Sequence, residues 1–230
     1  MLAGEVVVNE QVARKASEWV RDEDRLGVKA RDRYVSRGGH KLAHALQAFS
    51  ISVRSVTAID VGASTGGFTD CLLQQGAERV YAVDVGRGQL AWKLRQDPRV
   101  VVMEGVNARY LTPANFPKGF IPVDLGVIDC SFISLSKLIG TVAGWLRDGG
   151  LIVALIKPQF EAGKAEADRG RGVITDPAIH QRVIDTIRSF VEQHHPRLMW
   201  HGHVESPLRG PAGNKEFLVR IEKLEGNSWP

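Results

Sequence analysis

The stretch Asp60-Val-Gly-Ala-Ser-Thr-Gly-Gly-Phe-Thr69 decides the fold of this chain. It overlaps the end of an apolar run over residues 56–61, which predicts a short buried strand, and it continues into a helix predicted over residues 67–75. A strand that turns on glycines into a helix directs free backbone N–H groups and the positive helix end toward one point. This arrangement is typical of a site for the polar end of a nucleoside cofactor.

The glycine spacing and the neighbouring acids favour S-adenosylmethionine over a dinucleotide as that cofactor. Three residues separate Gly62 from Gly66-Gly67, so the G-x-G-x-x-G pattern of dinucleotide-binding turns is missing. Asp60, at the strand end, would repel a phosphate but attract a sulfonium cation. Asp84 ends the next apolar run, where an acid is placed to bind ribose hydroxyls. An ordinary tight turn without a ligand is the alternative.

Length and composition predict one globular domain with a small appendage. The 230 residues carry a net charge of +4, a modest excess that would suit a polyanionic partner. No apolar run approaches the ~20 residues of a membrane span. The two cysteines and the histidines near the C-terminus lack the spacing of metal ligands. We therefore expect a cytoplasmic protein with reduced thiols, no metal and no membrane contact.

From residue 56 onward, strand and helix patterns alternate, which predicts an α/β fold with a mostly parallel, doubly wound sheet. The strands are predicted over 56–61, 79–84, 100–103, 123–129 and 150–156, and the helices over 67–75, 87–96 and 134–146. A further helix begins at Pro177 after a capping Thr175 or Asp176. Strands over 198–206 and 216–223 then predict a C-terminal antiparallel hairpin.

Charged residues end four of the predicted strands: Asp60, Asp84, Asp129 and Lys157. Ligands of doubly wound sheets bind outside the carboxyl ends of the strands, so these residues are expected to share a site. Buried charges without a function are expensive, which strengthens that expectation. The glycine-rich, charged residues 158–174 follow Lys157 directly and predict either a lid over the site or a plain connection.

The N-terminal residues predict a partial module and not a complete domain. The pattern G-x-V-x-V-N-x-x-V, from Gly4 to Val12, resembles the latter half of an S4 RNA-binding module, and the basic helices that open that module are absent. We expect residues 1–30 to be an S4-like remnant and residues 31–35 a basic linker. Residues 36–225 would form the main domain and residues 226–230 a tail.

Six ordered stretches resemble the TlyA family, the haemolysin-named ribosomal-RNA 2′-O-methyltransferases related to FtsJ-type enzymes. They are Tyr34-Val-Ser-Arg-Gly-Gly-His-Lys-Leu42, Asp60-Val-Gly-Ala-Ser-Thr-Gly-Gly-Phe-Thr-Asp70, Val83-Asp-Val-Gly-Arg-Gly-Gln-Leu-Ala-Trp-Lys-Leu94, Asp129-Cys-Ser-Phe-Ile-Ser-Leu135, Leu155-Ile-Lys-Pro-Gln-Phe-Glu161 and Gly213-Asn-Lys-Glu-Phe217. The resemblance covers about residues 31–223 and implies a Rossmann-like class I methyltransferase fold.

The resemblance also implies a catalytic tetrad of Lys41, Asp129, Lys157 and Glu216. A ribose 2′-hydroxyl needs a base to take its proton, and a lysine can do so only when neutral, although free lysine has a pKa of about 10.4. Our hypothesis is that Lys157 is the base, that Asp129 and Glu216 orient it, and that Lys41 steers the ribose or its phosphate. The expected partner is ribosomal RNA or a ribosomal subunit.

Two further sets of residues complete the predicted site. The residues predicted to hold S-adenosylmethionine are Asp60, Gly62, Ser64, Thr65, Gly66, Gly67, Phe68, Asp84, Val85, Asn107 and Asp129. The residues predicted to contact RNA are Arg31, Arg33, Arg37 and His44. Arg37, Lys41 and His44 share one face of the helix predicted after the linker, and a solvated basic face without a ligand is the alternative.

Other functions stay open on the sequence alone. One alternative is an RNA-binding ribosome-assembly factor with weak or no turnover, and another is a membrane-active haemolysin, against which the absence of any membrane-length apolar segment argues. A small-molecule methyltransferase is a third, which the basic residues around Lys41 disfavour. Methylation of a base through Cys130 is poorly supported, because no acid–base partners surround this residue in the sequence.

Overall fold

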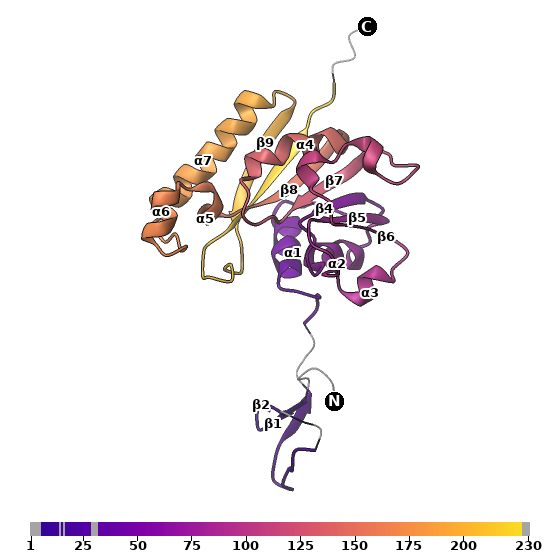
Figure 1. The fold of residues 1–230 in the computed structure, drawn as a ribbon, viewed down its shortest axis with the longest axis vertical. Coiled ribbons are helices and arrows are strands. Elements are labelled where there is room, and N and C mark those ends of the chain that lie inside the picture. Colours follow the sequence, from indigo (N-terminus) through magenta and orange to yellow (C-terminus); the bar gives the residue numbers. More distant parts are fainter. Residues whose placement is uncertain (1–5, 14, 16, 29–31, 227–230) are drawn as a thin grey trace. The chain divides into compact units, whose positions relative to one another are not determined.

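The computed structural model describes residues 6–13, 15, 17–28 and 32–226, and the chain divides into two units, Met1–Arg33 and Tyr34–Pro230. The predictions that concern Gly4, Arg31 and the residues after 226 lie outside the described residues, wholly or in part. Each unit is considered by itself (Figure 1).

The N-terminal unit contains a small antiparallel sheet in the order β2-β1-β3, built from β1 (Val6–Val8), β2 (Gln11–Val12) and β3 (Leu26–Val28). Asn9 and Glu10 have φ values of 50° and 68°, the conformation of the tight turns that join antiparallel strands. Asn9 also donates to Asp24 at 2.7 Å and accepts from the Arg25 N–H at 2.9 Å. The described residues of the stretch from Gly4 to Val12 therefore form two antiparallel strands joined by a tight turn.

The second unit is built on a seven-stranded sheet in the order β6-β5-β4-β7-β8-β10-β9. Its strands are β4 (Thr57–Val61), β5 (Arg79–Asp84), β6 (Val100–Glu104), β7 (Val123–Ile128), β8 (Leu146–Ile156), β9 (Leu198–Glu205) and β10 (Phe217–Lys223). Strands β4 to β8 pair in parallel, and β10 pairs antiparallel with both β8 and β9. The predicted doubly wound sheet with a C-terminal antiparallel hairpin is confirmed.

Helices cover both faces of this sheet (Figure 1). They are α1 (Gly38–Ala48), α2 (Gly67–Gln74), α3 (Trp92–Arg95), α4 (Ile139–Trp145), α5 (Pro158–Glu161), α6 (Lys164–Arg169) and α7 (Pro177–His194). Neighbouring strand residues point to opposite faces, so Ala58 belongs to the apolar cluster that includes residues of α1 and α2, whereas Ile59 belongs to the cluster that includes residues of α4 and α7. Two apolar layers thus hold the strand ends in register.

Two predicted helices are shorter in the structure than in the sequence pattern. The helix expected over 87–96 is confined to α3, because the N–H groups of Gly88, Gln89 and Leu90 donate to the carboxylate of Glu104. The helix expected over 134–146 is divided into a 3₁₀ turn, η3 (Leu135–Lys137), and α4. In both cases a carboxylate from another part of the chain, Glu104 or Glu161, binds backbone N–H groups ahead of the shorter helix.

The start of α7 and the segment before it clarify two other predictions. Asp176 caps α7 by accepting from the Ala178 N–H at 2.8 Å, as predicted. The segment expected as a lid or a plain connection contains α5 and α6. Glu166 on α6 forms an ion pair with Arg182 on α7, so this segment is attached to α7.

We expect Leu72→Ala to lower the free energy of unfolding by about 2–5 kcal/mol, because the Leu72 side chain on α2 is fully buried and its removal leaves a cavity. Urea unfolding measures the change. Glu78→Ala, at an exposed position between α2 and β5, is the control, with a change within about 0.5 kcal/mol. Equal effects of the two substitutions would contradict the assignment of the core.

Candidate active site

The site begins where β4 and β7 end side by side. The chain leaves β4 toward β5 on one side and reaches β7 on the other, so the strand order reverses between these neighbours. Gly62 has a φ of +85°, and a Cβ added to it would lie 2.6 Å from the carbonyl oxygen of Asp129. Only glycine permits this approach. The topological reversal therefore creates a crevice at the carboxyl ends of the strands.

Two adjoining cavities occupy this crevice. The lysine cavity has a volume of about 270 Å³ and is lined by both tetrad lysines, both tetrad carboxylates and the start of α1. The apolar cavity has a volume of about 470 Å³ and is lined by Asp84 and mostly apolar side chains. Four residues line both cavities: Gly62, Ser64, Asp129 and Ser131. A ligand that fills the apolar cavity can therefore extend toward the lysines.

The lysine cavity is organised by two ion pairs. Lys41 on α1 pairs with Glu216, which precedes β10, and both side chains are buried. Lys157 at the end of β8 pairs with Asp129 at 2.6 Å and donates a hydrogen bond to the Ser131 hydroxyl at 2.9 Å. Buried charges are tolerated when they are paired in this way. The structure thus brings all four predicted catalytic residues to one cavity.

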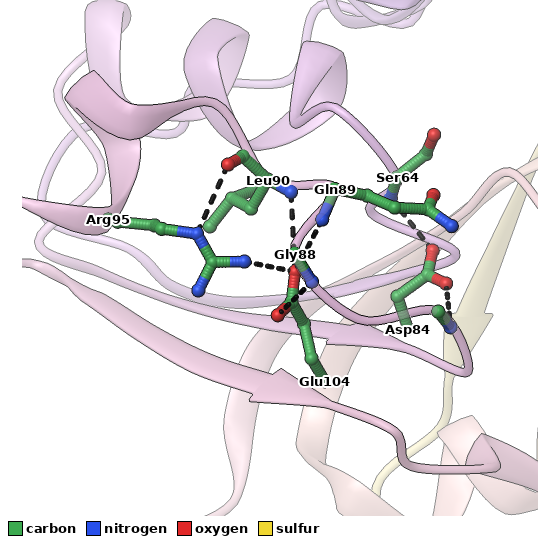
Figure 2. Close-up of polar contacts among 8 residues, drawn as sticks. Ser64, Asp84, Gly88, Gln89, Leu90, Arg95 and Glu104 are labelled. Atoms are coloured by element: carbon green, nitrogen blue, oxygen red, sulfur yellow. Dashed lines mark hydrogen bonds and ion pairs between the residues drawn. The ribbon is translucent and has the colours of Figure 1, made fainter.

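Asp84 lines the apolar cavity and binds the backbone of the two loops that follow β4 and β5 (Figure 2). Its two carboxylate oxygens accept from the N–H groups of Ser64 at 2.8 Å and Gly86 at 2.7 Å. Each oxygen has a second lone pair, so the carboxylate keeps acceptor capacity for a ligand. Asp84 therefore joins the loop after β4 to the loop after β5.

Glu104, opposite Asp84 on β6, organises the rest of that loop (Figure 2). Its carboxylate pairs with Arg95 and accepts from three successive backbone N–H groups, beginning with Gly88 at 2.8 Å. The hydrogen bond from Arg95, followed by those from the backbone, lowers the pKa of Glu104 to about 2. The loop after β5, which contains Gln89 of the apolar cavity, is thus held by the Glu104 carboxylate.

Two predicted cofactor residues, Asp60 and Gly66, lie behind the loop. Within the described part of the chain, neither lines a cavity. Asp60 is fully buried and accepts from the N–H and hydroxyl of Thr69 at 2.9 and 2.7 Å, which fixes the start of α2. A Cβ at Gly66 would lie 2.3 Å from Leu94, so this glycine allows α3 to pack closely. Both residues shape the loop from behind, and direct contact with the cofactor stays a prediction for each.

The remaining predicted cofactor residues border the crevice. Thr65, Gly67 and Phe68 line the lysine cavity, and Val85 and Asn107 line the apolar cavity. A Cβ at Gly67 would lie 2.2 Å from the Ser36 hydroxyl oxygen, so Gly67 also lets the start of α1 approach the loop. The glycine-rich loop after β4 therefore borders both cavities and also contacts the start of α1.

The predicted RNA contacts are only partly brought to the site. Arg37 is exposed and lines the lysine cavity. His44 lies further along α1 and is half-buried, outside the described lining of either cavity. Arg33 belongs to the N-terminal unit, and Arg31 is outside the described residues. Roles for these residues in RNA binding stay predictions.

Several residues of the site escaped prediction from the sequence. Ser131 contacts Lys157 and lines both cavities, and Phe132 has a side chain 90% exposed beside the apolar cavity. Phe132 also has a φ of 64°, a strained conformation for a bulky residue. Its ring lies 5.0 Å from that of Phe160. The only sequence signal was an aromatic residue close after a strand-end acid.

Cys130 is unsuited to act as a nucleophile. Burial, and then the negative charge of Asp129, raise the pKa of its thiol to about 12. A thiol with such a pKa is almost entirely protonated at neutral pH and therefore inert. The structure agrees with the low weight that the sequence gave to covalent catalysis by this residue.

A doubly wound sheet with a nucleoside-sized cavity and a lysine–carboxylate cavity at its switch point defines a class I methyltransferase. The chain belongs to the FtsJ-like methyltransferase family, whose model matches residues 34–223. Family membership confirms the predicted fold, a methyltransferase activity and S-adenosylmethionine as the methyl donor.

Relatives with informative names support this assignment. The 16S/23S rRNA (cytidine-2′-O)-methyltransferase TlyA of Mycobacterium tuberculosis is 48% identical over 81% of this chain and 67% of its own length. Hemolysin A of Brachyspira hyodysenteriae is 39% identical over 96% of this chain and 90% of its own length. A structure from Streptococcus thermophilus, described as a hemolysin, is 46% identical with a TM-score of 0.81 and covers 97% of this chain and 80% of its own. No helix in the described part of the chain is long and apolar enough to cross a membrane.

We expect Asp60→Asn to change how stability depends on pH. Burial raises the pKa of Asp60 from 3.8 to about 7, so the folded chain binds this proton more tightly than the unfolded chain. Stability should therefore fall as pH rises from about 4 to about 7, by on the order of 4 kcal/mol. Asparagine does not titrate, so the variant should gain stability relative to the wild type across this range. Urea unfolding at several pH values measures the difference, and parallel pH profiles would contradict it.

Proposed function

We propose that this protein transfers a methyl group from S-adenosylmethionine to a ribose 2′-hydroxyl of ribosomal RNA. The observation that carries the proposal is the pair of lysine–carboxylate ion pairs in a cavity that shares four residues with a nucleoside-sized cavity. The relatives named as ribosomal-RNA 2′-O-methyltransferases support the choice of substrate.

The residues around the apolar cavity fit S-adenosylmethionine. The cavity is of the size that holds a small ligand, and apolar side chains such as Val85 and Leu138 would enclose an adenine. Asp84 would accept from the ribose hydroxyls, and Asn107 lies on the same wall. The buried Oδ1 of Asp60, behind the loop, has no hydrogen-bond partner among the described residues. When bound, the cofactor supplies an activated methyl group on a cationic sulfur.

In the proposed mechanism, the Lys157 ammonium first releases a proton to water, and the neutral Nζ then takes the proton of the 2′-hydroxyl. Asp129 and the Ser131 hydroxyl hold that Nζ at the boundary between the two cavities. Lys41, fixed by Glu216, lies on the other side of the lysine cavity, where a cation would hold the ribose or its phosphate. Alignment of the hydroxyl oxygen with the methyl group is then the main catalytic contribution, and positioning of this kind can supply roughly 7–11 kcal/mol.

The surroundings of the lysine cavity suit a nucleotide within an RNA chain. Arg37 at the rim would contact a phosphate, and Arg33 and His44 are proposed as further contacts. A ribose can enter the cavity only if its base leaves the stack, and the exposed ring of Phe132 offers a surface for such a base. The S4-like N-terminal unit would add RNA contacts, and the protein would act in the cytoplasm, where ribosomal subunits are assembled.

The central test is transfer of a labelled methyl group to ribosomal RNA, with mapping of the methylated ribose. We expect Lys157→Ala and Lys157→Arg to abolish transfer while cofactor binding by calorimetry is retained. Arginine keeps the charge but cannot accept a proton, so it separates the base from a merely electrostatic role. Lys118→Ala, on an exposed loop before β7, is the control and should keep full activity. Substantial turnover by Lys157→Arg would eliminate Lys157 as the base.

We expect Phe132→Ala to lower the catalytic efficiency for RNA by roughly 10- to 100-fold, since base stacking on an aromatic ring contributes about 1–3 kcal/mol. Phe132→Tyr keeps a stacking surface and should stay close to the wild type. Steady-state methylation kinetics at varied RNA concentration measure both variants. Unchanged efficiency of Phe132→Ala would mean that the target base rests elsewhere.

A further inference from the structure

Glu161 is a half-buried carboxylate that the proposed mechanism leaves unused. It ends α5, the short helix that follows Lys157 directly. Its oxygens accept from the Leu135 N–H at 2.6 Å and the Ser134 hydroxyl at 2.7 Å. Burial raises the pKa of this carboxyl, and the two hydrogen bonds oppose that effect. An acid held in so apolar a place needs partners that it binds firmly.

The partners of Glu161 belong to the segment that walls the active site. Residues 129–135 follow β7 and contain Asp129, Ser131 and Phe132. Residues 129–133 line the apolar cavity, and residues 129 and 131 also line the lysine cavity. We call residues 129–135 the wall segment. Its first residues contact Lys157 and line the cavities, and its last two residues bind Glu161.

Three successive contacts join the wall segment to the residues that follow β8. Lys157 pairs with Asp129 and Ser131, the Phe160 ring contacts the Phe132 ring, and Glu161 binds Ser134 and Leu135. The contacts proceed in the same order along both segments. The first two contacts lie at the cavities. The third, made by Glu161, holds the end of the wall segment that is furthest along the chain.

The strained backbone of Phe132 indicates why the wall segment needs the contact with Glu161. This residue has a positive φ and a highly exposed side chain, so neither its backbone preference nor burial of its ring holds it in place. The segment after it begins η3, whose N-cap Ser134 also accepts from the Ser136 N–H. Glu161 fixes this turn to α5, and α5 is fixed to Lys157 by the chain itself.

We propose that Glu161 is a positioning residue for methyl transfer, which anchors the wall segment so that Asp129, Ser131 and Phe132 keep their places relative to Lys157. The inference rests on the proposed function, because it assigns Glu161 a role in that reaction. It predicts that the geometry of the acceptor group matters and that the negative charge itself matters little.

The experiment compares Glu161→Ala, Glu161→Gln and the control Glu166→Ala. Glutamine can still accept from the Leu135 N–H and donate to the Ser134 hydroxyl, whereas alanine can do neither. Glu166 is a carboxylate on neighbouring α6 that pairs with Arg182 on α7, outside the wall segment. Two readouts are measured on the full chain: amide hydrogen exchange of residues 131–137, and kcat and KM for ribosomal-RNA methylation.

We expect Glu161→Ala to exchange faster over residues 131–137 and to lose about 10²-fold in kcat, the size of effect that a displacement near 1 Å can have. Glu161→Gln should restore most of both, and Glu166→Ala should change neither. Equal impairment of Glu161→Gln and Glu161→Ala, or wild-type exchange and kcat in Glu161→Ala, overturns the inference. Should Glu161→Ala fail to fold, Glu161→Asp, with a carboxylate one methylene short, replaces it.

The two readouts separate this inference from the proposed function. If the wild-type chain transfers no methyl group to ribosomal RNA, the proposed function fails and the role in catalysis fails with it. The exchange data then still decide whether Glu161 anchors the wall segment. If the wild type is active and Glu161→Ala matches it, only the inference fails.

Discussion

The close approach of the β4 and β7 ends is the constraint on which the rest of the site depends. Gly62 lies against the backbone of Asp129, and the Asp129 N–H donates to the Val61 carbonyl at 3.0 Å. With these two strand ends in contact, the loop after β4 and the wall segment after β7 become opposite sides of one crevice. A side chain at residue 62 would force them apart, and the two cavities would no longer share a boundary.

The four charged side chains of the lysine cavity form two ion pairs, and each charge is neutralised by its partner. The two lysines are drawn from α1 and β8, and their carboxylate partners from the segment before β10 and the end of β7. Because both pairs are largely buried, loss of one partner would leave an uncompensated charge. Elements far apart in the sequence are therefore coupled through the cavity, which explains why the antiparallel strand β10 belongs to the catalytic unit as much as the parallel strands do.

The fold could be predicted from the sequence because local sequence patterns determine its strands, turns and helices. Apolar runs, glycines and helix caps such as Asp176 each act within a few residues. The same patterns predicted that Asp84, Asp129 and Lys157 would border one crevice, since they end parallel strands at the same edge of the sheet. They could not predict that Asp60 would turn inward, because the direction of a side chain at a strand end depends on the pleat and on Thr69 beyond the turn.

Glu104 and Glu161 show why the remaining parts of the site required the structure. Each is a carboxylate that accepts from backbone N–H groups or a hydroxyl 14 to 27 residues away, and no residue-type pattern identifies such partners. Each also organises a wall of the crevice without lining the two main cavities in the described part of the chain. Glu104 shapes the loop that would enclose the cofactor, and Glu161 holds the segment between cofactor and RNA. A methyltransferase that supplies alignment more than acid–base power needs such fixed walls, because alignment is lost when either wall moves.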